Sequence, residues 1–433
     1  MRRGIGIDFG TTNSALAVAN EGGEAVLATF TDGREQRSTF RSILFFEPES
    51  LPSSRPQVVA GPDAVRRYVE AGGRGRLVQS MKSHLASRLF TETNVFGHTY
   101  RLADLIAVII RGLRQQAEQQ FGTLQGSIVV GRPAHFSGAT TANDDAFALS
   151  RLRAGFQQAG VHDVRFEFEP VAAAYQYERQ LDHDELVLIG DFGGGTSDFS
   201  LIHLGPSRRD RSDRSRDILG VDGVGIAGDR FDSRIVRHLV APHLGLGASY
   251  RSAFDQTLPI PLWLYENLER WEHLSFLKTK PTMDLLHRLE FTADKPEQIA
   301  ALIHLVNDDL GYQLYRAIER TKFRLSEQPT SAFAFHDRPV EIATSVERAH
   351  FEAWVTPQLE AIEACITRLL EHCGVSVEKV GTVFLTGGSS FVPAVRRLFA
   401  DRFGADRVRG GEELTTVARG LALCALAEAS AAS

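Results

Sequence analysis

Apolar segments that end in an aspartate and a glycine-rich turn occur twice along the chain. Residues 5–8 end in Asp8 and residues 188–191 end in Asp191, and each segment is followed by glycines and hydroxyl side chains and then by a second apolar segment. Short apolar runs bounded by glycine are typical of buried strands. We therefore predict two duplicated β-hairpins, returning through residues 15–19 and 198–204, whose turns present backbone amides.

A third apolar strand, residues 380–385, leads through a Thr-Gly-Gly-Ser-Ser turn and Pro393 into the amphipathic segment 394–403, which predicts a strand, a turn and a helix. Apolar periodicity predicts further helices over residues 102–121, 144–159, 310–325 and 414–429, and strands over residues 127–131 and 164–168. A helix is also expected to begin at Glu169 and Pro170, because proline suits the first helical turn. Strands interspersed with helices indicate an α/β protein.

Residues 241–297 carry several prolines, Trp263 and Trp271, but no series of strand-like segments. We expect an irregular, mostly helical insertion in this part of the chain. At 433 residues the chain exceeds the usual size of a single hydrophobic core, so two or more domains are expected. The first lobe is expected to close near Glu185.

Composition excludes several classes of protein. Hydrophobic residues at 43% and charged residues at 24% are ordinary for a globular chain, and no run of eighteen apolar residues could span a bilayer. The first residues do not resemble a secretory signal, so we expect a cytoplasmic protein without membrane contact. A net charge of −6 gives no basic footprint for nucleic acid. Residues 208–216 alternate in charge sign and are expected to form a solvated loop.

The three cysteines, Cys365, Cys373 and Cys424, are spaced unlike a zinc site, and we expect small buried hydrophobic residues without disulfides. The fourteen histidines form no HExxH or HxH cluster. Residues 223–228 satisfy GxGxxG, but they follow a charged loop instead of opening a βαβ unit, so a dinucleotide site is not expected.

The two hairpins supply what a phosphate chain beside Mg²⁺ requires. Glycine lets a backbone approach phosphate oxygens, and threonine hydroxyls add donors. Asp8 and Asp191 would face each other, which is favourable only around a cation. The candidate phosphate-binding residues are Gly10, Thr11, Thr12, Asn13, Gly193, Gly194, Gly195 and Thr196.

Seven segments carry a family resemblance: GIDFGTTNSALAV from Gly6, VVGRPAHF from Val129, FEPVAAAYQYE from Phe168, DFGGGTSDFSLI from Asp191, AGDRFD from Ala227, AIERTKFRLS from Ala317 and FLTGGSSFVP from Phe384. Taken together in order and spacing, they resemble the nucleotide-binding half of the seventy-kilodalton heat-shock chaperones of the DnaK type. The resemblance covers nearly the whole chain, and GRPAHF, EPVAA and GGGTSDFSL are similar to the compact bacterial YegD branch, which has no substrate domain.

The resemblance implies an actin-like ATPase fold of the ribonuclease H-like type, with two duplicated lobes, each with a central mixed sheet and flanking helices. Lobe I would comprise residues 1–185, with 39–101 as its upper subdomain and the C-terminal helix 412–433 completing it. Lobe II would comprise residues 186–411, with 233–351 as a mostly helical upper subdomain. The chain would end where a chaperone's linker and peptide-binding domain begin.

The same resemblance implies roles for six residues around the phosphates. Asp8 and Asp191 would hold Mg²⁺ through water, and Glu169 would orient those waters. Thr196 would contact the γ-phosphate, and Asp198 would help position the attacking water. Lys82 falls where the family keeps a catalytic lysine that offsets charge on the γ-phosphoryl group. A surface lysine without a role is the alternative at that position.

Adenosine would lie between one helix, with Glu319, Lys322 and Ser326, and the third glycine loop, with Gly387, Gly388 and Ser389. Gly228 and Asp229 would shape a turn near the phosphates. The chain departs from the family at Phe323 and Phe391, where arginine is usual. Aromatic rings can stack on a purine, although both phenylalanines could instead fill a hydrophobic core.

These features lead us to expect ATP or ADP and Mg²⁺ as ligands, slow ATP hydrolysis coupled to lobe closure, and a chaperone-like role. The implied partners are nucleotide and client or co-chaperone proteins, with the chain itself a monomer. A small-molecule kinase of the same fold, an actin-like filament protein and a binding-only protein remain alternatives, because a fold alone does not determine a reaction.

Overall fold

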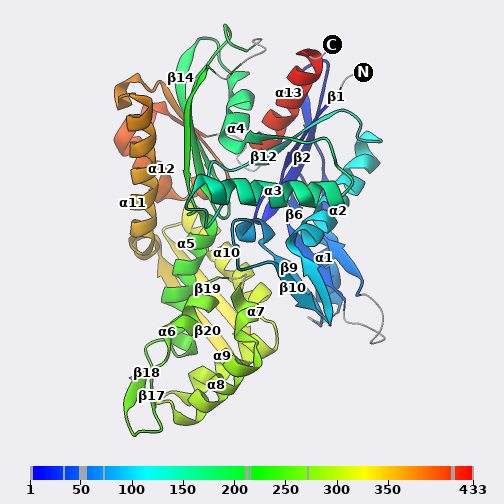
Figure 1. Cartoon of the computed structure of the whole chain (residues 1–433). Helices are drawn as coiled ribbons and strands as arrows, with labels where there is room; N and C mark the ends of the chain where they lie inside the picture. Colours follow the sequence, from blue (N-terminus) through cyan, green and yellow to red (C-terminus); the bar gives the residue numbers. More distant parts are fainter. Residues whose placement is uncertain are drawn as a thin grey trace. The chain divides into compact units, whose positions relative to one another are not determined.

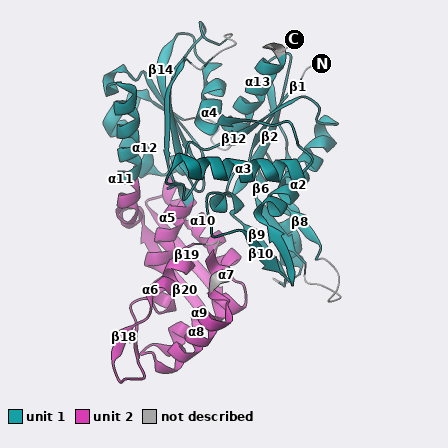
Figure 2. Ribbon diagram, viewed as in Figure 1, with its two compact units in different colours: residues 1–228, 360–433 teal, residues 229–359 magenta. Residues whose placement is uncertain are grey.

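We analysed a computed structural model of the chain, in which residues 3–32, 35–47, 56–71, 74–209, 214, 216–270, 273–410 and 415–431 are described. The chain divides into two compact units (Figure 2). Unit 1 comprises residues 1–228 and 360–433, and unit 2 comprises residues 229–359.

The first sheet of unit 1 is built around the first predicted hairpin. Its strand order is β13-β12-β1-β2-β3, with β6 paired to β2. Strands β1 and β2 are antiparallel, whereas β12 and β13 are parallel to β1. The bounds are β1 Arg3–Asp8, β2 Asn13–Asn20, β3 Ala25–Leu27, β6 Phe40–Arg41, β12 Ser127–Arg132 and β13 Arg165–Phe168.

The second sheet repeats this arrangement with the order β16-β15-β14-β21-β22. Strands β14 and β15 form the second predicted hairpin, and β21 and β22 are parallel to β14. The duplication predicted from the Asp-Gly-Thr segments is therefore confirmed at the level of strand order and direction. The bounds are β14 Glu185–Phe192, β15 Ser197–Leu204, β16 Ile218–Val224, β21 Thr382–Thr386 and β22 Val408–Gly410.

Two helices of small residues, α4 (Glu169–Glu178) and α13 (Thr416–Ala431), lie between the two sheets (Figure 1). Residues of α4 and α13 share one hydrophobic cluster with residues of both sheets, including Val129 and Ile189. Glycine is required where α13 packs, because a Cβ atom at Gly420 would lie 1.7 Å from the carbonyl oxygen of Ala172. The small side chains thus let α13 approach α4 closely enough to join the two sheets into one core.

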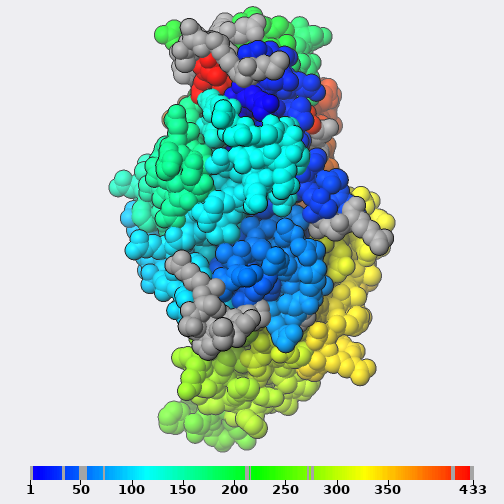
Figure 3. All heavy atoms as spheres, turned by 90° about the vertical axis from the view of Figure 1, so that its right-hand side faces the viewer, coloured from blue at the N-terminus to red at the C-terminus, as the bar shows by residue number. Residues whose placement is uncertain are grey.

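Helices α2 (Leu102–Phe121) and α3 (Ala142–Gln158) cover the outer face of the first sheet. In α2 the buried residues recur at helical spacing and enter the largest hydrophobic cluster. Thr141 caps α3 by accepting a hydrogen bond from the backbone N–H of Asp144. The cyan atoms of the segment around α2 form a continuous part of the surface of unit 1 (Figure 3).

On the second sheet, α12 (Pro393–Phe403) packs through Phe399 against Phe192 and Phe199. Helix α11 spans Arg348–Cys373. The segment before α2 contains short strands, one helix and a 3₁₀ turn: β4 Phe30–Asp32, β5 Glu35–Arg37, β7 Ile43–Phe46, β8 Val58–Ala60, α1 Pro62–Glu70, β9 Arg76–Gln79, the turn Met81–His84, β10 Glu92–Val95 and β11 His98–Arg101.

Unit 2 is helical with two antiparallel hairpins. The insertion contains the hairpin β17 (Ser249–Arg251) and β18 (Thr257–Pro259). The insertion, expected to be irregular and mostly helical, thus also contains one hairpin, which is only three residue pairs long and leaves no detectable alternation in the sequence. Trp271 lies outside the described residues. The other elements are α5 Gly228–Ile235, α6 Leu262–Leu268, α7 Leu274–Leu277, α8 Lys280–Thr292, α9 Pro296–Asn307, α10 Gly311–Glu327, β19 Thr330–Asp337 and β20 Val340–Glu347.

Two arginines of the charged segment 208–216, Arg208 and Arg214, form ion pairs with buried carboxylates. Arg214 donates to both carboxylate oxygens of the buried Glu178 at 2.9 Å, and it also pairs with Asp217 at 2.8 Å. Arg208 pairs with Asp217 as well. The expectation of a solvated loop is wrong for these residues, because the buried carboxylates need cations. Residues 210–213 and 215 lie outside the described part of the chain.

The cysteines Cys365 and Cys424 are buried as expected, whereas Cys373 is only partly buried; all three are free thiols. Among the described residues, no helix is both long enough and apolar enough to cross a bilayer.

Candidate functional site

The turns of the two hairpins in unit 1 lie close together. A Cβ atom at Gly195 would lie 3.2 Å from Oγ1 of Thr11 and 3.6 Å from Oγ of Ser83. A Cβ atom at Gly10 would collide with the carbonyl oxygen of Asn13 at 2.0 Å. The first turn therefore requires glycine at Gly10, whereas Gly195 leaves open backbone beside the Thr11 and Ser83 hydroxyls.

The tightness of the second turn comes from its own backbone. The N–H of Gly193 donates to the carbonyl oxygen of Thr196 at 3.0 Å, which closes the loop between β14 and β15. The N–H of Gly228 reaches the carbonyl oxygen of Gly193 at 3.4 Å. Thr11 and Thr196 are buried, whereas Thr12 and Asn13 are partly exposed at the start of β2.

Four carboxylates gather beneath these turns. Asp8 ends β1, Glu169 starts α4, and Asp191 and Asp198 face each other as partners across β14 and β15. Glu169, Asp191 and Asp198 are buried, and Asp8 is partly buried. Their elements are far apart in sequence and converge because both sheets end at the same place in unit 1.

Burial and mutual repulsion change the protonation of these groups. Burial first, and then the charge of Glu169, raise the pKa of Asp8 and of Asp198 to about 7. The pKa of Asp191 is raised well above its ordinary value, mainly by burial and then by Glu169 and Asp8. Such shifts are expected where like charges share a desolvated site. The cluster therefore favours an added cation.

Lys82 supplies one positive charge to the cluster. Its Nζ lies 2.6 Å from Oε1 of Glu169, and both side chains are buried. Although burial lowers the pKa of Lys82, the charges of Glu169 and Asp8 outweigh it and raise the pKa above its ordinary value. The alternative of a surface lysine is therefore wrong, because the 3₁₀ turn Met81–His84 carries Lys82 into the core. Its catalytic role stays a prediction.

The third glycine loop follows β21 in the same unit. Gly387 has a φ of +82°, and a Cβ atom there would lie 2.2 Å from the carbonyl oxygen of Phe192. The loop thus packs on the end of β14, with Gly388 starting a 3₁₀ turn and Ser389 buried. Phe391 is 42% exposed, so the alternative of a core phenylalanine is wrong at this position.

The predicted nucleotide-binding residues on α10, and Asp229 on α5, lie in unit 2. Lys322 on α10 donates to Oδ2 of the buried Asp232 at 2.8 Å. Ser326 donates its hydroxyl to the carbonyl oxygen of Lys322 at 3.2 Å.

Phe323 on α10 is 60% exposed, so it does not fill a core either. Glu319 lies on the same helix and pairs with Arg316 at 3.5 Å. Asp229 lies in the first turn of α5 and its carbonyl oxygen accepts a hydrogen bond from Ser233. Shared adenosine binding by these residues and the third glycine loop stays a prediction.

The GxGxxG segment begins in β16, a strand of the second sheet. Its first glycine, Gly223, lies in β16 opposite Asp198, and a Cβ atom there would lie 2.6 Å from Oδ1 of Asp198. Strand β16 is antiparallel to β15, whereas a dinucleotide fingerprint follows a strand of a parallel βαβ unit. Glycine at position 223 therefore allows β16 to pack closely against Asp198.

The residues present fit a hydrated divalent cation. Within the described ranges, no group of three or more His, Cys, Asp or Glu side chains is arranged to ligate a metal directly. After burial and the charge of Glu169, the charge of Asp8 nevertheless also raises the pKa of Asp191, so a cation shared by the two carboxylates would relieve their repulsion. Mg²⁺ typically keeps several of its waters and uses few direct carboxylate ligands, which suits this pair.

Sequence reasoning did not identify three residues that complete the site. Ser83 lies beside the Gly195 backbone, and Ala134 donates its N–H to Oδ1 of Asp198 at 2.6 Å. Arg132 lies close enough to Glu169 and Asp198 for their charges to affect its pKa. The GRPAHF segment contains two of these residues, but its resemblance alone assigned them no role.

Comparison with known proteins gives a consistent result. A family model described as Hsp70 protein matches residues 4–244 and 294–430, which leaves residues 245–293 unmatched. The stromal 70 kDa heat shock-related protein of the Pisum sativum chloroplast is 26% identical over 93% of this chain and 50% of its own length. The chaperone protein DnaK of Deinococcus proteolyticus is 27% identical over 94% of this chain and 56% of its own length.

This chain thus spans about half the length of the curated relatives that it matches. The unmatched residues lie in the insertion that contains β17, β18 and helices α6 to α8. Both the duplicated sheets and the family match point the same way: the chain belongs to the Hsp70 family, and its fold is the actin-like ATPase fold of that family's nucleotide-binding domain.

Proposed function

We propose that the chain binds ATP with Mg²⁺ and hydrolyses it slowly, in a chaperone-type cycle. The observation that carries this proposal is the buried cluster of Asp8, Glu169, Asp191 and Asp198 around Lys82, directly beneath two glycine turns. A cluster so short of positive charge, beside open backbone amides, suits a ligand that brings both a cation and phosphate oxygens.

Each residue has a role that follows from its surroundings. The open backbone at Gly195 and the hydroxyls of Thr11 and Thr196 would bind phosphate oxygens. Asp8 and Asp191 would hold the hydrated cation, and Glu169 would orient its waters while keeping Lys82 in place at 2.6 Å. The other phosphate-turn residues of the proposal are Gly10, Thr12, Asn13, Gly193, Gly194, Gly228 and Asp229.

Two features would promote hydrolysis. Lys82 would hold its positive charge towards the γ-phosphoryl group, because its raised pKa keeps it protonated at neutral pH. Asp198, held by the Ala134 N–H, would accept a hydrogen bond from the attacking water and align it. Bound Mg²⁺ would neutralise charge that develops on the phosphate oxygens.

Adenosine recognition would depend on aromatic rings as well as polar groups. The exposed rings of Phe323 and Phe391 are available for stacking on a base. Glu319, Lys322 and Ser326 on α10, and Gly387, Gly388 and Ser389 in the third loop, are the proposed polar neighbours. The known relatives suggest that client proteins and co-chaperones are the macromolecular partners, with lobe closure as the output.

The test measures binding and hydrolysis separately. Isothermal titration of Mg-ATP into the wild-type protein should give saturable heat. The substitution Asp191→Asn should reduce the affinity for Mg-ATP at least tenfold, because it removes a negative charge from the cation site while the side chain keeps its shape. Asp182→Asn is a matched control, since Asp182 is exposed in a turn outside the cluster. Phosphate release should fall at least a hundredfold in Lys82→Met. Equal heats for wild type and Asp191→Asn would contradict the proposal.

A further inference from the structure

The turn that follows β12 connects the two sheets of unit 1 through hydrogen bonds. The backbone N–H of Ala134 donates to Oδ1 of Asp198 on β15 at 2.6 Å. The backbone N–H of Phe136 donates to Oδ1 of Asp145 on α3 at 2.8 Å. Oδ1 of Asp198 is therefore held by a turn that follows a strand of the first sheet, while Thr196 of its own hairpin also hydrogen-bonds the carboxylate.

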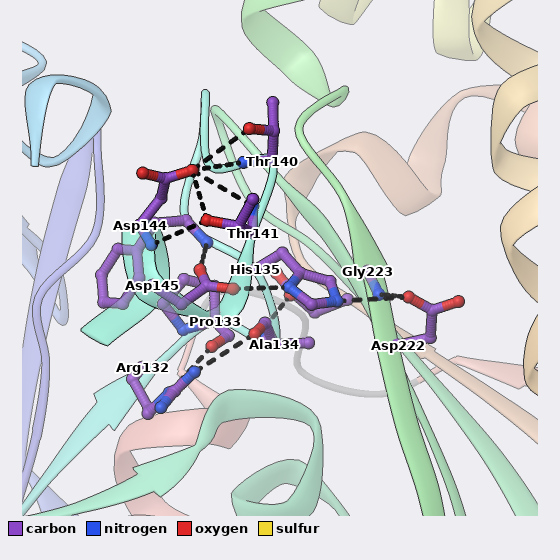
Figure 4. Close-up of polar contacts among 12 residues, drawn as sticks. Arg132, Pro133, Ala134, His135, Thr140, Thr141, Asp144, Asp145, Asp222 and Gly223 are labelled. Atoms are coloured by element: carbon purple, nitrogen blue, oxygen red, sulfur yellow. Dashed lines mark hydrogen bonds and ion pairs between the residues drawn. The ribbon is translucent and has the colours of Figure 1, made fainter. Parts of the chain in front are cut away.

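Arg132 stiffens this turn from one side. Its guanidinium donates to the carbonyl oxygens of Pro133 at 3.1 Å and Ala134 at 3.2 Å (Figure 4). The same guanidinium stacks on the ring of Phe168, 4.6 Å from its centroid. Arg132 thus holds the Pro133–Ala134 peptide, whose N–H reaches Asp198, through the carbonyl oxygen of that peptide and the carbonyl oxygen of the next one.

His135 holds the turn from the other side, between Asp145 and Asp222 (Figure 4). Its Nδ1 lies 2.7 Å from Oδ2 of Asp145 on α3, and its Nε2 lies 3.5 Å from Oδ1 of Asp222 on β16. Because each ring nitrogen faces a carboxylate, the imidazolium form can donate to both, whereas the neutral ring can donate to only one. His135 is the residue after Ala134, so its position constrains the Ala134 peptide directly.

The two carboxylates favour the imidazolium, although each of them also interacts with an arginine. Arg368 on α11 pairs with Oδ2 of Asp222 at 3.3 Å, and Arg132 lies close enough to interact with the charge of Asp145. The hydrogen bond to Asp222 and the contact with Asp145 raise the pKa of His135 to about 9, even though partial burial lowers it. His135 is therefore positively charged at neutral pH and bridges an element of the first half of unit 1 to a strand of the second half.

We propose that His135 is a positioning residue for the proposed hydrolysis: through its ion pairs with Asp145 and Asp222 it holds the Ala134 N–H on Asp198, and so fixes the carboxylate that aligns the attacking water. This inference rests on the proposed ATPase function. It assigns His135 no contact with nucleotide, so its loss should lower kcat and leave nucleotide affinity unchanged.

The experiment compares phosphate release and Mg-ATP affinity in the wild type, His135→Ala and His183→Ala. His183 is a matched control, because it also pairs with an aspartate, Asp182 at 2.6 Å, but lies in an exposed turn away from the site. We expect His135→Ala to lower kcat about tenfold with less than a twofold change in KM. This loss is smaller than the ~10²–10⁴-fold contribution of a direct general acid or base, because His135 acts only through the Ala134 peptide. His183→Ala should match the wild type.

A pH profile separates positioning from a general structural effect. The ratio of wild-type kcat to His135→Ala kcat should be about ten at pH 7 and approach one as the pH rises through about 9, because the wild type then loses its imidazolium. His135→Lys, which keeps a cation above that pH, should retain part of the wild-type kcat and keep it at pH 9.5. If His135→Ala proves unstable, Asp222→Asn should show the same loss of kcat.

The possible failures are distinguishable. A wild-type protein that does not hydrolyse Mg-ATP would overturn the proposed function together with this inference. Wild-type hydrolysis that is undiminished in both His135→Ala and Asp222→Asn would overturn the positioning role alone. A kcat ratio that stays constant between pH 7 and pH 9.5 would also overturn it.

Discussion

Removal of the Lys82 charge should destabilise the folded protein before any nucleotide is added. Lys82 is buried 2.6 Å from Glu169, within a cluster that also contains Asp8, Asp191 and Asp198. In Lys82→Met the side chain keeps much of its volume, but the carboxylates lose their cation. The change therefore isolates charge from packing.

The expected magnitude follows from the geometry of the pair. Two unit charges 2.6 Å apart attract each other by about 6 kcal/mol at an effective dielectric constant of about 20. The desolvation of the ammonium group offsets part of this attraction, and breaking a buried pair typically costs ~3–5 kcal/mol. For a unit of this size, such a loss lowers Tm by roughly 6–10 °C.

The assay is thermal unfolding at pH 8 without nucleotide. Lys278→Met is a matched control, since Lys278 also lies 2.6 Å from a carboxylate, that of Asp309, but both side chains are more than 40% exposed. An exposed pair contributes at most about 1 kcal/mol, so the control should shift Tm by no more than about 2 °C. The double variant Lys82→Met/Glu169→Met should recover most of the lost stability, because it leaves no new unpaired carboxylate.

A Tm for Lys82→Met that equals the wild type, or exceeds it, would refute the reasoning. It would mean that the carboxylates are neutral or solvated at pH 8 and do not depend on Lys82. A Tm loss of the same size in Lys278→Met would also refute it, because the effect would then not depend on burial.

Three further outcomes are expected. Gly420→Ala should lower the free energy of unfolding by ~1–3 kcal/mol in urea titrations, because its Cβ would meet the Ala172 carbonyl; Gly112→Ala, with its nearest contacts at 3.3 Å, should cost less. Gly195→Ala should weaken Mg-ATP binding in calorimetric titrations while Tm stays within about 2 °C of the wild type, since the added methyl enters the phosphate turn and no tightly packed core. The free energy of unfolding of the nucleotide-free protein should fall between pH 5 and pH 8, because the folded-state pKa values of Asp8 and Asp198 are raised to about 7. The stabilising contribution of the two protonated carboxyl groups is complete below their unfolded pKa near 4 and is lost as the pH rises through 7. Mg-ATP should reduce this loss of stability.

The strand boundaries and the glycine turns were predictable because their signals are local. An apolar run ending in Asp8 or Asp191, followed by glycine, predicts a strand and a turn whatever the rest of the chain does. The predicted helix 102–121 has the bounds of α2, because a long run of apolar residues at helical spacing is the strongest such signal. The hairpin β17–β18 was missed, because three residue pairs carry no detectable alternation.

The site itself combines local and long-range information. Asp8 and Asp191 could be singled out, because each ends a repeated strand, and the repeat is visible in the residues themselves. The pairing of Lys82 with Glu169 joins residues 87 positions apart, and no sequence pattern encodes that contact. The Ala134 hydrogen bond to Asp198 and the His135 bridge likewise exist only because β12, α3 and β16 converge.

By itself the sequence determined which of the long apolar segments become strands and helices, where the turns need glycine, and that the two hairpins have the same sequence pattern. Only the tertiary structure decided that Lys82 is buried, that Phe323 and Phe391 are exposed, and that the Asp8 and Asp198 pKa values rise to about 7. The physical reason is range: backbone preference and periodicity act over a few residues, whereas burial and charge interactions depend on which distant segments pack together.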